Sequence, residues 1–385
     1  MLYNIQFLRF VAAMLVVLYH SAIRLPENDS AFRIIFNAGE SVGFAGVDIF
    51  FVISGYIMAH TSAGQSGTAN SMNFARRRLA RIFSGYWPFF ILAVIIFAYL
   101  RPEHFAASNL VKSFLLWPQP LNHVLLEITW TLSFELYFYL LFSLLILFFS
   151  PRNRFGLIWA TFCFLLLFNS YRHFILHSFS PDNIYFLSFW SQFLSSPFLL
   201  EFFGGALLCW WLTKRPGGPG LAWLTAGSLL FLAGGWINEA LYSGLIEQGF
   251  HVVPRVFVFG IPSVMILMGL VRMETAATVD GAGTRPGQTR GWQAPTRFSA
   301  MTGGASYAIY LSHILILTVV WNTGFNPFVA TLPANLIIAA YILLMAAILG
   351  FSVVHYTWLE KPLHRLFKRW LGLQPGLRKT TRDRD

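Results

Sequence analysis

The feature that most constrains this chain is a series of long apolar runs separated by short polar segments. Runs of about 18 or more apolar residues are long enough to cross a bilayer as helices. The chain is 56% hydrophobic and only 11% charged, whereas soluble domains carry about 25% charged residues. We therefore predict an all-α membrane protein, a polytopic bundle of about ten transmembrane helices. The predicted spans are 5–23, 40–60, 84–100, 125–149, 156–170, 189–212, 220–237, 252–271, 304–321 and 333–356.

Prolines interrupt two of these spans. Pro197 should kink the sixth and Pro262 the eighth, because proline removes a helical hydrogen bond. The stretch 109–120, NLVKSFLLWPQP, is too short to span, so we expect an interfacial or re-entrant piece there.

Charge gives the predicted bundle an orientation. With a cytoplasmic N-terminus, the inside segments hold 20 of the 27 Lys and Arg residues and the outside loops hold five. This bias follows the positive-inside rule, so both termini are expected in the cytoplasm. Topology thereby explains the net charge of +11 without a nucleic-acid partner. Segment 275–297 is rich in Gly, Thr and Pro and is expected to be a flexible cytoplasmic loop.

Other common classes of site are not indicated. Cys163 and Cys209 lie in apolar runs and form no CxxC pattern, so redox chemistry is not expected. There is no HExxH and no Cys/His cluster at ligand spacing, so no metal is expected. The N-terminus lacks a cationic flank and a credible cleavage site, which favours a retained first span.

The first span carries two ionisable residues, Arg9 and His20. Eleven residues separate them, which places them on one helical face roughly 16 Å apart. Taken singly, Arg9 could extend to the inner headgroups and His20 could be a hydrogen-bonded bundle residue. Two costly residues on one face favour a functional cavity instead.

Further polar residues occur at similar depths in other spans. Asp48 is either an interfacial acid or a site residue, and Ser54 with Gly55 is favoured as a helix-packing pair. Glu135 lies at mid-membrane, where a carboxylate needs a partner. His313, taken alone, is more typical of a satisfied core histidine. The basic cluster Arg77, Arg78 and Arg81 either reports topology or binds phosphate.

Five stretches in order resemble acyltransferase family 3, integral membrane enzymes that acylate carbohydrates and related molecules. They are Arg9 with His20, GVDIFFVISGY (46–56), RRLARI (77–82), WTLSFELYFY (130–139) and SYAIYLSH (306–313). The match covers residues 9 to 313 and is most similar to the exopolysaccharide-modifying branch. Residues 1–358 would form the transmembrane domain and 359–385 a basic cytoplasmic tail, without the fused extracytoplasmic hydrolase-like domain of some members.

The resemblance implies an O-acyltransferase of the bacterial cytoplasmic membrane. Its donor would be cytoplasmic acyl-CoA, usually acetyl-CoA, and its acceptor a hydroxyl of a cell-surface or exported glycan, in some cases lipid-linked. His20 is expected to act as general base or as a covalent acyl relay, two roles that remain open. Glu135 first, or else Asp48, would orient it. The donor would contact Arg9, Arg77, Arg78 and Arg81, and the substrate would be lined by Tyr310, His313, Arg255, Glu201 and Ser54.

Two other functions are compatible with ten spans and buried charges. The first is a transporter or flippase for a lipid-linked glycan, although no internal repeat is evident. The second is a non-catalytic subunit of a polysaccharide export complex. If the chain is an acyltransferase, either the membrane domain performs the whole reaction or an extracytoplasmic partner protein completes it.

Overall fold

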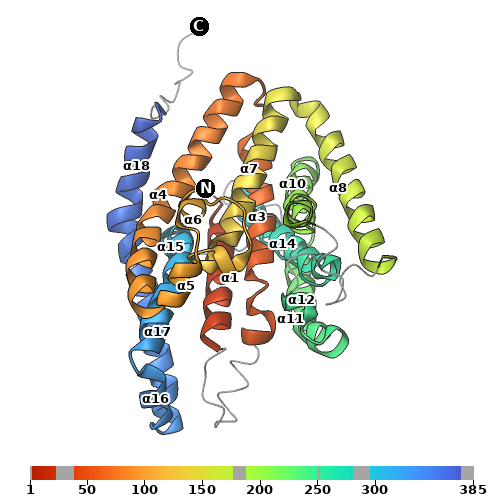
Figure 1. Cartoon of the computed structure of the whole chain (residues 1–385). Coiled ribbons are helices and arrows are strands. Elements are labelled where there is room, and N and C mark those ends of the chain that lie inside the picture. Colours follow the sequence, from red (N-terminus) through yellow and green to blue (C-terminus); the bar gives the residue numbers. More distant parts are fainter. Residues whose placement is uncertain (1, 23–38, 177–187, 249–251, 281–294, 374–385) are drawn as a thin grey trace.

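The computed structural model describes residues 2–22, 39–176, 188–248, 252–280 and 295–373 (Figure 1). Within these ranges the chain is helical and contains no β-strand. Ten of its helices are long and apolar enough to cross a membrane, which confirms the predicted number of spans. Much of the predicted loop 275–297 and the end of the chain, 374–385, lie outside the described residues.

The spanning helices are longer than the other helices and run through the whole chain. They are α1 (Tyr3–Ala22), α3 (Gly46–Thr61), α4 (Thr68–Leu100), α7 (Trp130–Phe148), α8 (Pro151–Phe174), α10 (Phe198–Lys214), α11 (Gly220–Tyr242), α14 (Ile261–Asp280), α15 (Thr296–Asn322) and α17 (Ala334–His355). The shorter helices are α5 (Pro102–Ala107), α6 (Leu110–Phe114), α9 (Phe189–Leu194), α12 (Leu245–Gln248), α13 (Val253–Arg255), α16 (Phe325–Ala330) and α18 (Lys361–Trp370).

Helix α3 forms the centre of the bundle and packs closely on α10. Of the apolar window containing α3, 83% is buried, against 22% for the peripheral helix α8. A Cβ on Gly55 would lie 1.8 Å from the carbonyl oxygen of Phe202, and one on Gly205 would lie 2.0 Å from that of Val52. Only glycine fits at these two positions, so the backbones of α3 and α10 touch directly. The predicted packing role is thus confirmed for Gly55.

Helix α4 begins at Thr68, sixteen residues before the predicted start of the third span. Hydropathy does not detect this part because it is polar and basic, although arginine is a good helix former. The early start matters for function. It places Arg77, Arg78 and Arg81 on a rigid helix rather than in a loop.

The structure departs from a regular α-helix beside both Pro197 and Pro262. Helix α9 ends at Leu194 and α10 begins at Phe198, directly after Pro197. Pro262 lies in the first turn of α14, behind a π-helical segment, Val256–Gly260. The stretch 109–120 contains only the five-residue helix α6, so it does not span, as predicted.

The last spanning helix does not stop at the membrane domain boundary predicted at residue 358. It continues from α17 through a π-helical segment, Tyr356–Glu360, into α18. Helix α18 lies along the first part of α4 (Figure 1), where the rings of Phe367 and Trp87 are 5.4 Å apart. Residues 359–370 are therefore packed against the spanning bundle.

Candidate active site

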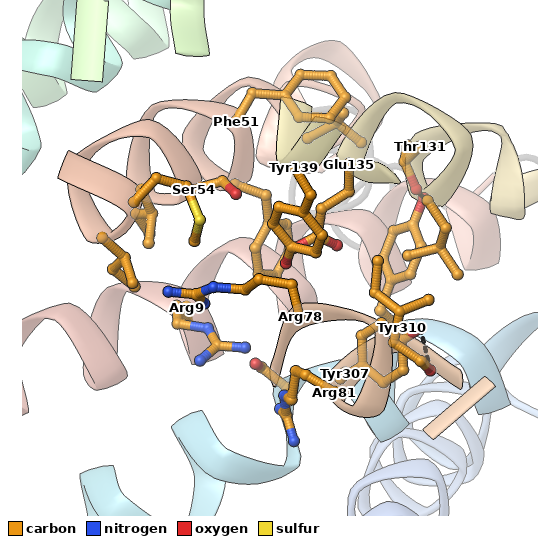
Figure 2. A pocket seen from close by; sticks show the side chains of 18 residues that line it. Arg9, Phe51, Ser54, Arg78, Arg81, Thr131, Glu135, Tyr139, Tyr307 and Tyr310 are labelled. Atoms are coloured by element: carbon orange, nitrogen blue, oxygen red, sulfur yellow. Dashed lines mark hydrogen bonds between the residues drawn. The ribbon is translucent and has the colours of Figure 1, made fainter. Parts of the chain in front are cut away.

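Two cavities lie along α1, one near each end of the helix. The first, here called the arginine cavity, has a volume of about 120 Å³ (Figure 2). The second, here called the histidine cavity, has a volume of about 260 Å³. Arg9 lines the first and His20 the second, and both cavities are lined by Val47 and Tyr310. The two residues that share a helical face therefore face two adjoining chambers.

Three arginines from two helices line the arginine cavity: Arg9 of α1 and Arg78 and Arg81 of α4 (Figure 2). Arg81 forms an ion pair with Glu360, with 2.6 Å between Nη1 and Oε1. Arg78 donates a 2.8 Å hydrogen bond to the hydroxyl of Thr61. Arg9 donates no hydrogen bond and forms no ion pair within the described part of the chain. Of the three guanidinium groups, Arg9 is the one without a hydrogen bond or ion pair to the described residues.

Polar groups of α3 and α7 complete the wall. Glu135 accepts a hydrogen bond from the hydroxyl of Tyr139, one helical turn later. Ser54 also lines the cavity, and its buried hydroxyl makes no hydrogen bond with the described residues. Ser54 is therefore placed at the cavity rather than only at the helix contact that its neighbour Gly55 forms.

Tyr310 separates the two cavities. Its hydroxyl donates a 2.9 Å hydrogen bond to the carbonyl oxygen of Ile128 and lies 2.9 Å from Oγ1 of Thr131. These bonds join α15 to the start of α7. Any ligand that extends from one cavity to the other must pass this tyrosine and Val47.

His20 pairs with a second histidine. Its Nδ1 lies 2.9 Å from the carbonyl oxygen of Val16 and 3.2 Å from Nε2 of His313. The Nδ1 of His313 lies 3.2 Å from the carbonyl oxygen of Ile309. A carbonyl only accepts, so in the neutral rings each Nδ1 carries the proton. Nε2 of His313 then accepts from His20, and Nε2 of His20 keeps a free lone pair.

Asp48 and Arg255 form a buried bidentate ion pair. Nε and Nη2 of Arg255 donate to the two carboxylate oxygens of Asp48 at 2.9 and 2.8 Å. The guanidinium also lies over the rings of Phe44 and Phe198, 5.0 and 5.2 Å from their centroids. Such geometry offsets the desolvation of both charges.

The predicted site residues thus divide into three groups. Arg9, Arg78, Arg81, Glu135, Ser54 and Tyr310 line the arginine cavity, and His20, Arg255 and Tyr310 line the histidine cavity. His313 and Asp48 lie behind the second cavity as partners of His20 and Arg255. Arg77 and Glu201 line neither cavity: Arg77 is exposed on α4, and Glu201 is buried beside Gly260.

Asp48 and Glu135 were predicted to orient His20, but each of these three residues has a different partner in the structure. Within the described residues His20 bonds to His313, whereas Asp48 pairs with Arg255 and Glu135 with Tyr139. The reason is competition, because a buried arginine is a stronger partner for Asp48 than a neutral imidazole.

Several lining residues were not predicted from the sequence. Tyr19, Glu127, Trp130 and Glu247 line the histidine cavity, and Glu360 forms an ion pair with Arg81 of the arginine cavity. Glu127 lies three residues before the acid-containing motif at 130–139, and Trp130 is the first residue of that motif, which was a usable signal. Glu247 comes from the short helix α12, and Glu360 lies where the last span continues into α18, in the part predicted to be a cytoplasmic tail.

Among the described residues, no group of three or more His, Cys, Asp or Glu side chains could hold a metal ion.

Comparisons with known proteins identify the family of the chain. Residues 2–357 match the family described as "Acyltransferase domain". The chain is 30% identical over 340 residues to "Exopolysaccharide production protein ExoZ" of Rhizobium meliloti (strain 1021), covering 84% of this chain and 90% of that protein. No solved structure shows a significant match. The chain belongs to acyltransferase family 3 and is a multi-pass membrane protein of that family.

Proposed function

We propose that the protein transfers an acyl group, most simply acetyl, from acyl-CoA to a hydroxyl of an exopolysaccharide glycan. The observation that carries the proposal is the course of α1, which brings Arg9 to one cavity and His20 to the next. An anionic donor and a nucleophilic hydroxyl then have separate chambers that adjoin at Val47 and Tyr310.

The arginine cavity suits the donor. Acyl-CoA carries phosphates on one end and a thioester on a long flexible arm. Arg9 is unpaired within the described residues, and Arg78 and Arg81 lie beside it in the cavity. Guanidinium groups bind phosphate oxygens well because their donors form a planar fork. The arm would extend past Tyr310 toward His20.

The basic residues in the first half of α4 support entry of the donor from the cytoplasmic side. Arg76, Arg77, Arg78 and Arg81 lie at the end of the bundle that the positive-inside rule assigns to the cytoplasm. Cytoplasmic acyl-CoA would enter from that end, and the histidine cavity would open toward the other side. The exopolysaccharide link of the relative in Rhizobium meliloti and the ten spans favour the bacterial cytoplasmic membrane.

His20 is the proposed general base. Its free Nε2 would accept the proton of the acceptor hydroxyl while that oxygen attacks the thioester carbonyl. A C–O ester bond forms, the C–S bond breaks, and the thiolate leaves, taking the proton from His20 to become the thiol of CoA. Nε2 of His313 would accept a hydrogen bond from the Nδ1–H of His20 throughout. This keeps the ring of His20 oriented, as the acid does in a catalytic triad.

The test uses purified protein reconstituted in vesicles, radiolabelled acetyl-CoA and an exopolysaccharide acceptor. The proposal predicts acetate bound to the glycan as an ester that mild alkali releases. A transporter would move glycan across the vesicle membrane without labelling it. Glycan movement without any label would contradict the proposal.

A further inference from the structure

The histidine cavity contains carboxylates that the transfer step above does not use. Glu127 comes from the turn before α7, and Glu247 comes from α12. Both line the same cavity as His20, together with the indole of Trp130. Residues from three distant parts of the chain therefore line one cavity.

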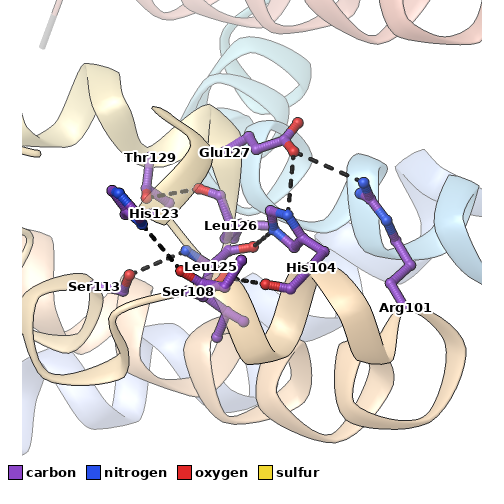
Figure 3. Close-up of polar contacts among 10 residues, drawn as sticks. Arg101, His104, Ser108, Ser113, His123, Leu125, Leu126, Glu127 and Thr129 are labelled. Carbon is purple, nitrogen blue, oxygen red and sulfur yellow. Dashed lines mark hydrogen bonds and ion pairs between the residues drawn. The ribbon is translucent and has the colours of Figure 1, made fainter. Parts of the chain in front are cut away.

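Glu127 is held in position from outside the cavity (Figure 3). Its Oε1 lies 3.8 Å from Nη2 of Arg101 and 3.7 Å from Nδ1 of His104. The other ring nitrogen of His104 is 2.9 Å from the carbonyl oxygen of Leu125, which ties the imidazole to the same loop. The Glu127 side chain remains 50% exposed, so its carboxylate is accessible to a ligand.

Glu247 is fixed from α1. Its Oε1 accepts a 2.5 Å hydrogen bond from the hydroxyl of Tyr19, the residue directly before His20. The backbone carbonyls of Ile246 and Glu247 lie 3.5 Å from Nη1 of Arg255, which anchors α12 at the cavity. A position held by side chain and backbone together suits a binding residue.

The two cavities differ in charge. The one cation that lines the histidine cavity within the described residues is Arg255, and Asp48 neutralises it. Two carboxylates, Glu127 and Glu247, also line this cavity, and the partner of Glu127, Arg101, lies outside the lining. The arginine cavity is lined by three guanidinium groups and one carboxylate, Glu135, so its excess charge has the opposite sign. A charged sugar acid entering the histidine cavity would meet like charges.

We propose that the histidine cavity binds an uncharged, hydroxyl-rich sugar residue and discriminates against sugars that bear a carboxylate. Glu127 and Glu247 accept hydrogen bonds from two of its hydroxyls, Trp130 provides an apolar wall, and a further hydroxyl reaches Nε2 of His20. Carboxylates suit polyols because each offers several acceptor positions. This inference rests on the proposed function and adds to it the class of acceptor and the residues that select it.

The test compares matched acceptors with purified wild-type protein and radiolabelled acetyl-CoA. The probes are methyl glucoside, methyl galactoside and methyl mannoside, each paired with the corresponding methyl uronide. We expect kcat/KM to be at least about tenfold higher for a neutral glycoside than for its uronide. A tenfold ratio corresponds to the free energy of about one charge-assisted contact. Equal use of both classes, or preference for the uronides, would overturn the inference while leaving acyl transfer intact.

Substitutions test whether Glu127 and Glu247 select the acceptor sugar. Glu127→Gln and Glu247→Gln should each raise KM for the neutral acceptor by about tenfold, with kcat and KM for acetyl-CoA nearly unchanged. The double variant should lose most of the discrimination against uronides. Glu103→Gln is the matched control, because this exposed acid lies on α5 and lines neither cavity. An unchanged acceptor preference in the double variant would also overturn the inference. Absence of label on every glycoside while the exopolysaccharide is still labelled would overturn this inference alone, whereas absence of label on both would contradict the proposed function.

Discussion

Nε2 of His313 lies 3.2 Å from Nδ1 of His20, and these two residues come from α15 and α1. The contact joins the first and ninth spans at the wall of the histidine cavity. Each ring also bonds through Nδ1 to a carbonyl of its own helix, one turn earlier. The pair therefore orients His20 without a carboxylate and leaves its Nε2 free for a substrate proton.

Removal of the second histidine should weaken catalysis more than binding. His313→Ala deprives the Nδ1 proton of His20 of one acceptor, so kcat should fall by roughly tenfold or more with little change in either KM. His313→Gln can still accept this hydrogen bond through its amide oxygen and should restore part of the rate. Steady-state kinetics of the three proteins provide the measurement. Equal activity of His313→Ala and wild type would show that His313 has no part in orienting His20.

Arg81 and Arg77 form a matched pair of arginines on one helix. Arg81 lines the arginine cavity, whereas Arg77 is exposed and lines neither cavity. Arg81→Ala should raise KM for acetyl-CoA by about tenfold, the effect of one charge-assisted phosphate contact. Arg77→Ala should change it by less than about twofold. Titration of acetyl-CoA under initial-rate conditions distinguishes them, and similar losses in both variants would indicate a general effect of surface charge.

The buried ion pair gives a prediction about stability. Asp48 is fully buried and Arg255 is 6% exposed, so Asp48→Asn leaves a buried cation without its bidentate partner. We expect a loss of about 3 kcal/mol in the free energy of unfolding. The double variant Asp48→Asn/Arg255→Met should recover much of it, because it removes the cation as well. Thermal unfolding in detergent measures both, and a double variant less stable than the single one would contradict this role.

Acceptor binding should depend on pH through Glu247, which lies outside the spanning helices. Burial raises the pKa of this carboxyl, against a smaller opposing effect of the hydrogen bond from Tyr19. The nearby charged groups are Glu40, Glu239 and Arg255, and the two acids raise the pKa further. A raised pKa means that the carboxylate is protonated at a higher pH than an ordinary glutamate.

KM for a neutral acceptor should accordingly rise as the pH falls through this range, and Glu247→Gln should remove that rise. The measurement is acceptor KM from about pH 5 to about pH 8 in wild type and variant. The same pH dependence in both proteins would exclude Glu247 as its origin.

Hydropathy was sufficient to predict the fold class and the number of spans. Burial in lipid demands long apolar helices, and this requirement is visible in a single sequence. The prediction that Arg9 and His20 lie on one face of the first helix also followed from helical geometry. The start of α4 was missed because its first turns are polar, although they carry the arginines of the cavity.

The partners of the site residues could not be predicted in the same way. Asp48 and Arg255 are 207 positions apart, and His20 and His313 are 293 positions apart. Such pairs depend on which helices become neighbours, which local periodicity does not specify. Sequence reasoning therefore named His20, Asp48 and Glu135 but paired them incorrectly with one another. Glu247 was missed because it comes from a short connecting segment, and Glu360 because the residues after 358 were assigned to a tail rather than to the bundle.

The role of His20 is tested most directly by acyl transfer in purified His20→Ala protein. The measurement is the initial rate of transfer from radiolabelled acetyl-CoA to glycan, with acetyl-CoA binding and thermal unfolding measured on the same sample. We predict transfer at background level, with acetyl-CoA binding and stability close to those of wild type. Transfer at near wild-type rate by the folded variant would contradict the assignment of His20 as the base.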